Sequence, residues 1–232
     1  MNTFRFSKYA LGLLITAFSL QSCLKDDKIT DLRPTAVVTV RPQADDTFFL
    51  QLDDVTRLNP TNMKKSPFGK KEVRALVKYT KESNDTKSKA QNVRIHWIDS
   101  IRTKQPVPNL GADNNTKYGN DPIEIVRDWL TVAEDGYLTL RVRTQWSRAN
   151  VKHNISLVTG INPQNPYELE LRHDAKGDIG GPMGEAIIAF NLNDLPQSTD
   201  PSKKVKLKLK WKSFNGEKSA DFDLQLRPKV KP

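Results

Sequence analysis

The stretch Lys71-Glu72-Val73-Arg74-Ala75-Leu76-Val77-Lys78-Tyr79 decides the fold class, because β-branched and aromatic residues recur along it on alternating sides. A period of two places successive side chains on opposite faces of a β-strand. The same alternation is found in 36–40, 48–52 and 92–98, and a short strand is expected around Arg57-Leu58. The chain is therefore predicted to be all-β.

These five strands follow one another closely and are separated by turn residues. The segments 42–46, 53–54 and 66–69 carry the Pro, Asp and Gly that tight turns require. No segment of helical period separates the strands, and the polar tract 83–90 is typical of a hairpin tip. Five strands within about seventy residues predict a small closed or half-closed barrel of the OB kind. We assign this barrel to residues 35–102.

A second β region is predicted after residues 103–118, which are rich in Pro, Asn and Gly and indicate a linker. Strands are predicted at 123–132, 137–143, 153–158, 167–173, 185–192, 204–211 and 220–226. Asp135-Gly136 and Asn215-Gly216 are residue pairs suited to two-residue hairpin turns. Strands at this spacing predict an antiparallel β-sandwich over residues 119–232.

The first 22 residues have the features of a cleavable secretion signal. Basic Arg5 and Lys8 precede an apolar run at 10–18 that is too short to span a bilayer. Ser22 and Cys23 resemble the end of a bacterial lipobox, which implies cleavage after Ser22 and lipid attachment at Cys23. The alternative is a cysteine buried in a membrane or core helix, and the short run with its polar flanks argues against it. We expect residues 1–22 to be removed and 23–34 to form a lipidated tether.

Two short motifs point to the outside of the cell. Lys25, Asp26 and Asp27 directly follow the lipid cysteine and resemble the export signal of surface lipoproteins of Bacteroidota. Asp99-Ser100-Ile101 resembles an O-glycosylation signal of the same bacteria, with Ser100 as the modified residue. Cys23 is the only cysteine, so the folded part has no disulfide and no thiolate for catalysis or metal binding.

Four segments, taken in their order, resemble the NigD-like lipoproteins of Bacteroidota. They are Phe49-Leu50-Gln51-Leu52-Asp53-Asp54, Arg74-Ala75-Leu76-Val77-Lys78-Tyr79, Gly119-Asn120-Asp121-Pro122-Ile123 and Leu169-Glu170-Leu171-Arg172-His173. The resemblance covers nearly all of the chain after Cys23, and it implies an N-terminal OB domain and a C-terminal β-sandwich. The family is named after a bacteriocin gene cluster, which suggests a role in immunity.

The sequence shows no recognisable catalytic or metal motif. His96, His153 and His173 fall on separate predicted strands, and none has a second ligand at the spacing of a zinc motif. The carboxylate pairs at 45–46, 53–54 and 134–135 are chain neighbours, which face opposite ways on a strand and cannot share a proton. The glycines at 180, 181 and 184 fit no phosphate-binding loop. We expect no metal and no cofactor, and we predict that the protein is not an enzyme.

A lysine strip is the most regular surface feature. It consists of Lys204, Lys206, Lys208, Lys210 and Lys212, which alternate with apolar residues and share one face of a predicted strand. The strip could protect a sheet edge from unwanted pairing, which we favour, or it could bind lipid A phosphates or acidic glycans. The net charge of +10 falls to +8 without Arg5 and Lys8, and a charge of this size serves solubility or long-range steering.

Together these features predict a non-enzymatic, surface-exposed outer-membrane lipoprotein that binds a protein or glycan partner. A bacteriocin immunity lipoprotein and a surface glycan-processing accessory or hydrolase are the alternatives. Many OB folds bind nucleic acid through exposed aromatics in a basic groove. We do not expect that partner, because the protein is predicted to lie outside the cell and aromatics such as Phe48 and Tyr79 alternate like core residues. The oligomeric state is left open.

Overall fold

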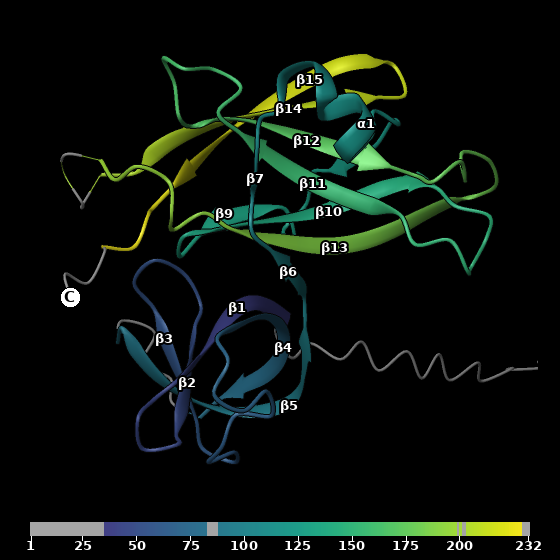
Figure 1. Cartoon of the computed structure of the whole chain (residues 1–232). Helices are drawn as coiled ribbons and strands as arrows, with labels where there is room; N and C mark the ends of the chain where they lie inside the picture. The colour runs from purple at the N-terminus through teal and green to yellow at the C-terminus, as the bar shows by residue number, and fades with distance from the viewer. Residues whose placement is uncertain (1–34, 83–87, 199, 201–202, 229–232) are drawn as a thin grey trace, which may run out of the picture. The chain divides into compact units, whose positions relative to one another are not determined.

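The computed structural model describes residues 35–82, 88–198, 200 and 203–228, and strands dominate this part of the chain (Figure 1). Its first five strands are β1 (Thr35–Pro42), β2 (Phe48–Gln51), β3 (Arg57–Pro60), β4 (Val73–Lys81) and β5 (Ala90–Ser100). They form a closed barrel in the order β1-β2-β3-β5-β4. All neighbours are antiparallel except β3 and β5.

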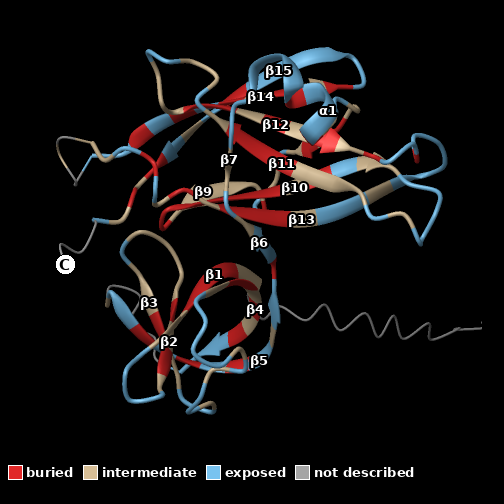
Figure 2. Cartoon of the chain, in the orientation of Figure 1, coloured by how far each residue is buried: buried red, intermediate tan, exposed pale blue. Residues whose placement is uncertain are grey.

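The barrel interior is filled by the apolar side chains that alternation predicts. Val38 and Val40 of β1 face Ala75 and Val77 of β4 in one buried cluster, which also includes Leu50. Figure 2 shows buried residues along these strands. The OB-like barrel prediction is therefore confirmed.

The second part of the chain folds into two sheets. One contains β6 (Arg102–Lys104), β13 (Met183–Asn191), β10 (Tyr137–Gln145) and β8 (Glu124–Val126) in that order, with β9 (Val132–Glu134) paired to β10. The other has the order β15 (Gly216–Leu224), β14 (Val205–Ser213), β12 (Glu168–Asp174), β11 (Asn154–Thr159) and β7 (Val107–Pro108). Leu140, Phe190, Leu171 and Leu209 from both sheets meet in one buried core, which confirms the β-sandwich.

The sheets differ from the expected sandwich in their pairing. Most neighbours are antiparallel, but β6 pairs with β13, β7 with β11 and β12 with β14 in parallel. The predicted strand 123–132 is divided into β8 and β9, because Asp128 caps a turn by accepting a hydrogen bond from the Leu130 amide at 3.0 Å. Backbone pairing sets the strand directions, so side-chain alternation does not reveal them.

Residues 103–118, which we expected to link the domains, carry structure of their own. They contain part of β6, all of β7, a 3-10 turn at Gly111–Asp113 and the short helix α1 at Asn114–Tyr118. Tyr118 is buried and its hydroxyl donates to the carbonyl of Pro108 at 3.0 Å. The segment is thus held against the sandwich.

The two predicted hairpin turns have different outcomes. Asp135 and Gly136 both take positive φ, at 52° and 76°, and connect β9 to β10 as expected for a two-residue turn. At the β14–β15 hairpin, Ser213 pairs with Gly216, so Phe214 and Asn215 occupy the turn instead of Asn215 and Gly216. Gly216 still requires glycine, because its φ is 99°. No helix among the described residues is long and apolar enough to cross a bilayer.

Candidate ligand-binding site

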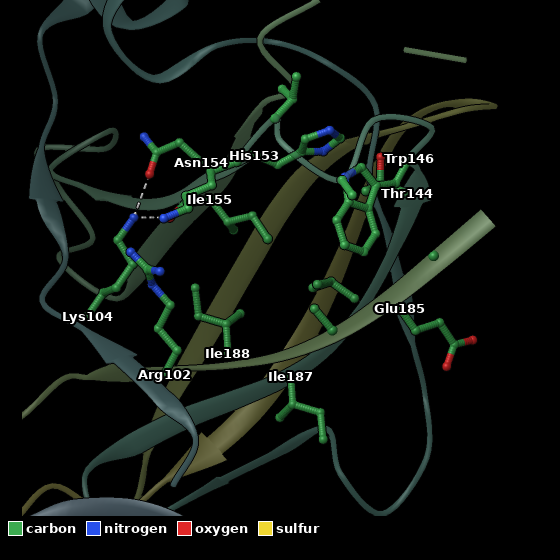
Figure 3. Close-up of a pocket in the computed structure, with 16 residues that line it drawn as sticks. Arg102, Lys104, Thr144, Trp146, His153, Asn154, Ile155, Glu185, Ile187 and Ile188 are labelled. Atoms are coloured by element: carbon green, nitrogen blue, oxygen red, sulfur yellow. Dashed lines mark hydrogen bonds between the residues drawn. The ribbon is translucent and has the colours of Figure 1, made fainter. Parts of the chain in front are cut away.

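An apolar cavity of about 380 Å³ lies between the two sheets at one end of the sandwich (Figure 3). Its walls come from the end of β10, the start of β13, the start of β11 and the edge strand β6. The volume is within the range of roughly 300–1,000 Å³ typical of small-molecule pockets. The cavity is therefore large enough to hold a ligand.

The cavity exists because side chains become smaller along the inner face of β13. Alternate residues Phe190, Ile188, Ala186 and Gly184 lie on this face, and they decrease in size towards the start of the strand. Phe190 and Ile188 are buried in the sandwich core, whereas Ala186 is exposed. Protein interiors are normally close-packed, so this loss of side-chain volume leaves the end of the core open.

Trp146 forms one wall of the cavity and lies directly against Gly184. A Cβ atom on Gly184 would stand 3.4 Å from Cε3 of the indole, so the small residue lets the ring approach the strand. The indole Nε1 donates to the carbonyl of Arg148 at 3.0 Å, which fixes the ring's orientation. The wall opposite includes Ile155 of β11.

Two cations of β6 border the cavity. Lys104 Nζ donates to Asn154 Oδ1 at 2.8 Å and to the carbonyl of Ile155. Burial and the neighbouring Arg102 lower the pKa of Lys104. Within the described residues, neither Arg102 nor Lys104 has a carboxylate partner, and the one carboxylate of the lining, Glu185, is held by Arg141 and Arg143. Figure 3 shows Glu185 directed away from the two cations.

A chain of polar contacts runs behind the cavity wall. His153 Nδ1 lies 2.9 Å from His173 Nε2, and His153 Nε2 lies 3.3 Å from an oxygen of Asp178. Asp178 also accepts hydrogen bonds from the Ser147 hydroxyl and from the Ser147 and Arg148 amides. These donors, the Ser147 hydroxyl foremost, hold the pKa of Asp178 well below its usual range. The Asp178 carboxylate therefore holds the loop that carries Trp146 in place.

The proton of the His173 imidazole can be assigned from its partner. His173 Nδ1 is 3.1 Å from the carbonyl of Pro122, which only accepts, so this nitrogen carries a proton. Burial, with the repulsion of His153, lowers the pKa of His173, so its Nε2 is left to accept from His153. The Ser147 hydroxyl donates to Asp178 and not to a histidine.

The histidine pair is a feature that we did not predict. We considered each histidine alone, whereas antiparallel pairing of β11 with β12 sets Ile155 opposite His173 and brings His153 beside it. One signal was available, since His173 continues the inward series Leu169 and Leu171 and is itself buried. The third histidine, His96, is exposed on β5, and its Nε2 is 2.7 Å from the Thr80 hydroxyl.

Three large apolar side chains are exposed near the cavity, two on loops and one, Met183, at the start of β13. Trp146, Ile179 and Met183 are 47%, 62% and 47% exposed. Their loops are joined by a hydrogen bond from the Trp146 amide to the Pro182 carbonyl and by the pairing of Gln145 with Met183. We call these three residues the apolar loop patch.

Comparisons with known proteins agree with this architecture. A NigD-like N-terminal OB domain matches residues 37–101, and a NigD-like C-terminal beta sandwich domain matches residues 105–224. The chain belongs to the NigD-like family. The resemblance seen in the sequence is thereby confirmed. No curated protein matches this NigD-like chain.

Several solved structures are similar to this NigD-like protein. One, from Parabacteroides distasonis and named as toxin related, is 29% identical with a TM-score of 0.69, and the match covers 83% of this chain and 93% of that one. A NigD-like immunity protein from Bacteroides caccae is 20% identical, with a TM-score of 0.58 and coverage of 82% and 91%. A Bacteroides fragilis protein named as a lipoprotein is 12% identical, with a TM-score of 0.55 and coverage of 85% and 100%. The last two show the fold alone.

Two of the segments that carried the NigD-like resemblance meet behind the cavity. Gly119 has a φ of 79°, and a Cβ atom there would stand 2.4 Å from the carbonyl oxygen of His173. The Asp121 amide donates to that same carbonyl at 2.9 Å, and Asp121 accepts from the Ala175 amide at 2.7 Å. The glycine therefore permits the close approach that brings the Pro122 carbonyl to His173.

In this NigD-like sandwich the lysine strip lies on the opposite face of β14 from the apolar residues, as predicted. The position of β14 in its sheet differs from the prediction. Val205, Leu207, Leu209 and Trp211 are buried. The edge-protection interpretation is wrong, because β14 lies between β15 and β12 and not at an edge. Carboxylates accompany three of the lysines, since Lys204 pairs with Asp54, Lys206 with Asp223 and Lys210 with Glu168. Lys212 donates to the Asn120 carbonyl at 2.9 Å, and Lys208 is exposed.

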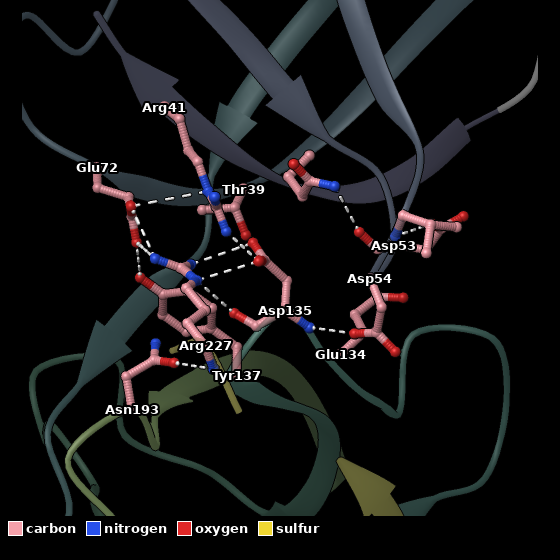
Figure 4. A network of polar contacts seen from close by, with 12 residues as sticks. Thr39, Arg41, Asp53, Asp54, Glu72, Glu134, Asp135, Tyr137, Asn193 and Arg227 are labelled. Carbon is pink, nitrogen blue, oxygen red and sulfur yellow. Dashed lines mark hydrogen bonds and ion pairs between the residues drawn. The ribbon is translucent and has the colours of Figure 1, made fainter. Parts of the chain in front are cut away.

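A buried polar network joins the barrel to the sandwich (Figure 4). Arg74 of β4 is fully buried, and it pairs with Glu134 and donates to the hydroxyls of Thr39 and Thr139 at 3.0 and 3.2 Å. Asp135 accepts from Arg41 of the barrel and from Arg227 near the end of the chain. Burial raises the pKa of Glu134 and of Asp135, although the arginines act in the opposite direction.

Several predicted site residues cannot be placed in this structure. Ser22, Cys23 and the segment Lys25-Asp26-Asp27 lie outside the described residues. Ser100 is exposed at the end of β5. Among the residues that the structure describes, no cluster of three or more His, Cys, Asp or Glu could hold a metal ion.

Proposed function

We propose that this NigD-like protein is a non-enzymatic lipoprotein, anchored in the outer membrane through Cys23 and facing the medium, whose sandwich binds a protein partner. The observation that carries the binding role is the apolar loop patch of Trp146, Ile179 and Met183. The lipobox resemblance at Ser22 and Cys23 supports the anchor, as does the name of the Bacteroides fragilis neighbour.

The patch favours a protein over a glycan among the partners predicted from the sequence. Tryptophan and methionine are enriched in protein–protein interfaces. Single exposed apolar residues are common on protein surfaces, whereas a group of them marks an interaction site. Trp146 and Ile179 lie on loops and Met183 begins β13 at one end of the β-sandwich, the position from which such folds commonly present binding surfaces. The Asp178 contacts hold one of these loops in place before binding, which reduces the entropy lost on association.

Photo-crosslinking in intact cells tests this surface. A photoreactive residue at Ile179 is expected to label a partner that the same residue at Val55 does not. Val55 is the matched control, because it is 61% exposed against 62% for Ile179 but belongs to the barrel. Ile179→Asp should abolish co-purification of the labelled partner, whereas Val55→Asp should not. Identical labelling from both positions would exclude the patch as the docking surface.

The anchor and the exported location are tested separately. Cys23→Ala should release the protein from the membrane fraction or leave it unprocessed. Replacing Lys25, Asp26 and Asp27 by alanine should protect the protein from protease added to intact cells. A Cys23→Ala variant that remains membrane-bound to the wild-type extent would disprove the lipid anchor.

Immunity to a bacteriocin is the second candidate function. It is favoured by the name of the Bacteroides caccae neighbour and by the family itself. If the partner captured through Ile179 is a secreted toxin, deletion of this gene should sensitise the cell to that toxin. We do not propose glycan hydrolysis, because Glu134, Asp135 and Asp178 are each held by arginines or by hydrogen bonds as structural groups.

A further inference from the structure

The cavity has features of a site for a small molecule in addition to the patch for a protein. Its lining combines an apolar interior with a few polar groups at one side, which is the usual composition of a ligand pocket. Val142, Ile155 and Ile188 supply apolar surface, and the indole of Trp146 covers one side. Transfer of an apolar group from water into a cavity with such walls is favourable.

The charge at the cavity is positive and not neutralised by the protein. Arg102 and Lys104 repel one another, and among the described residues no carboxylate pairs with either. His153 belongs to the same lining, and its two ring nitrogens face His173 and Asp178. Lys152 is a further cation of the rim. An anion beside Arg102 and Lys104 would relieve this repulsion and complete their hydrogen bonding.

We propose that the cavity binds a small amphiphile that has an apolar body and one anionic group. The apolar body lies between Trp146 and Ile155, and the anionic group lies against Arg102 and Lys104. A carboxylate or a phosphate would meet the same requirement, because both present oxygen acceptors to a guanidinium and an ammonium. This binding does not depend on the protein partner proposed above, and the two proposals can fail independently.

A pair of fluorescent probes separates the apolar and the anionic contributions. 1-Anilinonaphthalene-8-sulfonate and N-phenyl-1-naphthylamine share an aromatic body, and only the first carries a negative charge. Fluorescence titration of the full mature chain should show saturable binding of both probes at one site, with the sulfonate bound at least about tenfold more tightly. Energy transfer from tryptophan to the bound probe should decrease in Trp146→Phe.

Two substitutions that should leave the fold intact test the cavity as the binding site. Ala186→Leu fills the cavity from the inner face of β13 and should abolish binding of both probes. Arg102→Gln should weaken the sulfonate by about tenfold, the amount expected for one lost charge-assisted hydrogen bond, and should leave the neutral probe unchanged. Lys208→Gln is the matched control, because it removes an exposed lysine from the outer face of β14. Circular dichroism and thermal unfolding verify that each variant is folded.

Competition then distinguishes the head groups. Dodecanoate and dodecyl phosphate are expected to displace the sulfonate probe, and dodecanol is not expected to do so at the same concentration. Stronger displacement by one of the two anions identifies the preferred head group. Equal affinity of the charged and neutral probes, or unchanged binding in Ala186→Leu, would overturn the proposal. Neither result would affect the apolar loop patch, because Ile179 and Met183 are unaltered.

Discussion

Replacing Arg74 with methionine should destabilise the protein by about 3 kcal/mol, because this buried arginine compensates the charge of Glu134. Arg74 has no exposed surface, and the Glu134 side chain is 17% exposed. Removing one partner of a buried ion pair typically costs about 3–5 kcal/mol, since the other charge stays desolvated. The residual exposure of Glu134 places the estimate at the low end of this range. Two hydrogen bonds, to Thr39 and Thr139, are lost as well.

Calorimetry and urea unfolding measure this loss. For a unit of about 200 residues, a loss of about 3 kcal/mol lowers Tm by roughly 6–12 °C. The double variant Arg74→Met with Glu134→Gln should be more stable than Arg74→Met alone, because the glutamine leaves no uncompensated charge. The coupling between the two positions should be at least about 1.5 kcal/mol.

The pH dependence of the Arg74→Met deficit provides an independent test. Burial raises the pKa of Glu134 in the folded protein, and Arg74 lowers it, so removal of Arg74 raises it further. A raised carboxyl pKa means that the folded state retains its proton at a higher pH than the unfolded chain does, and stability is lost as pH rises. The deficit of the variant should therefore shrink as pH falls through the further raised pKa of Glu134 in the variant, and it should be smallest once Glu134 is protonated in both folded proteins. A loss below about 1 kcal/mol at neutral pH, or a deficit that does not depend on pH, would refute the reasoning.

Three further predictions concern the polar contacts behind the cavity. Burial lowers the pKa of His173, so below about pH 6.5 the unfolded chain binds a proton that the folded protein does not. The free energy of unfolding should therefore fall on acidification by at most about 1.4 kcal/mol per pH unit. His173→Gln should flatten this slope in urea titrations. Asp178→Ala should increase hydrogen exchange of the Ser147 and Arg148 amides by about tenfold or more, because both amides donate to that carboxylate. Gly119→Ala should cost at least about 2 kcal/mol in chemical unfolding, because the position has positive φ and no room for Cβ; a smaller loss would mean that the segment shifts away from β12.

The strands were predictable because their side chains alternate, and the irregular features were not. Alternate residues of each of β1, β4 and β10 are apolar and lie in one core, so a period of two is visible in their sequences. β6 and β7 span only Arg102–Lys104 and Val107–Pro108 and join their sheets through backbone pairing. Segments of this length cannot show a period.

Burial of Arg74 shows a second limit of sequence reasoning. Its neighbours Ala75 and Val77 point into the barrel, and alternation assigns Arg74 to the opposite face, which in a lone barrel would meet solvent. The hairpin tip at Glu134 and the hydroxyl of Thr139 cover it instead. The composition of one domain does not indicate which of its outward faces another domain covers. A different limit hid the histidine pair, because strand register and not sequence spacing brings His153 to His173.

The candidate site depends on contacts that also stabilise the fold. The glycine at 119 lets the Pro122 carbonyl reach His173, and His173 supports His153, which with Asp178 orders the loop that carries Trp146. That loop then supplies both a wall of the cavity and one residue of the apolar loop patch. Since loops that bind partners are usually the least stable part of a sandwich, a buried carboxylate with several donors is an effective way to keep this one ordered. Loss of ligand binding in Asp178→Ala without global unfolding would separate this ordering role from a contribution to the core.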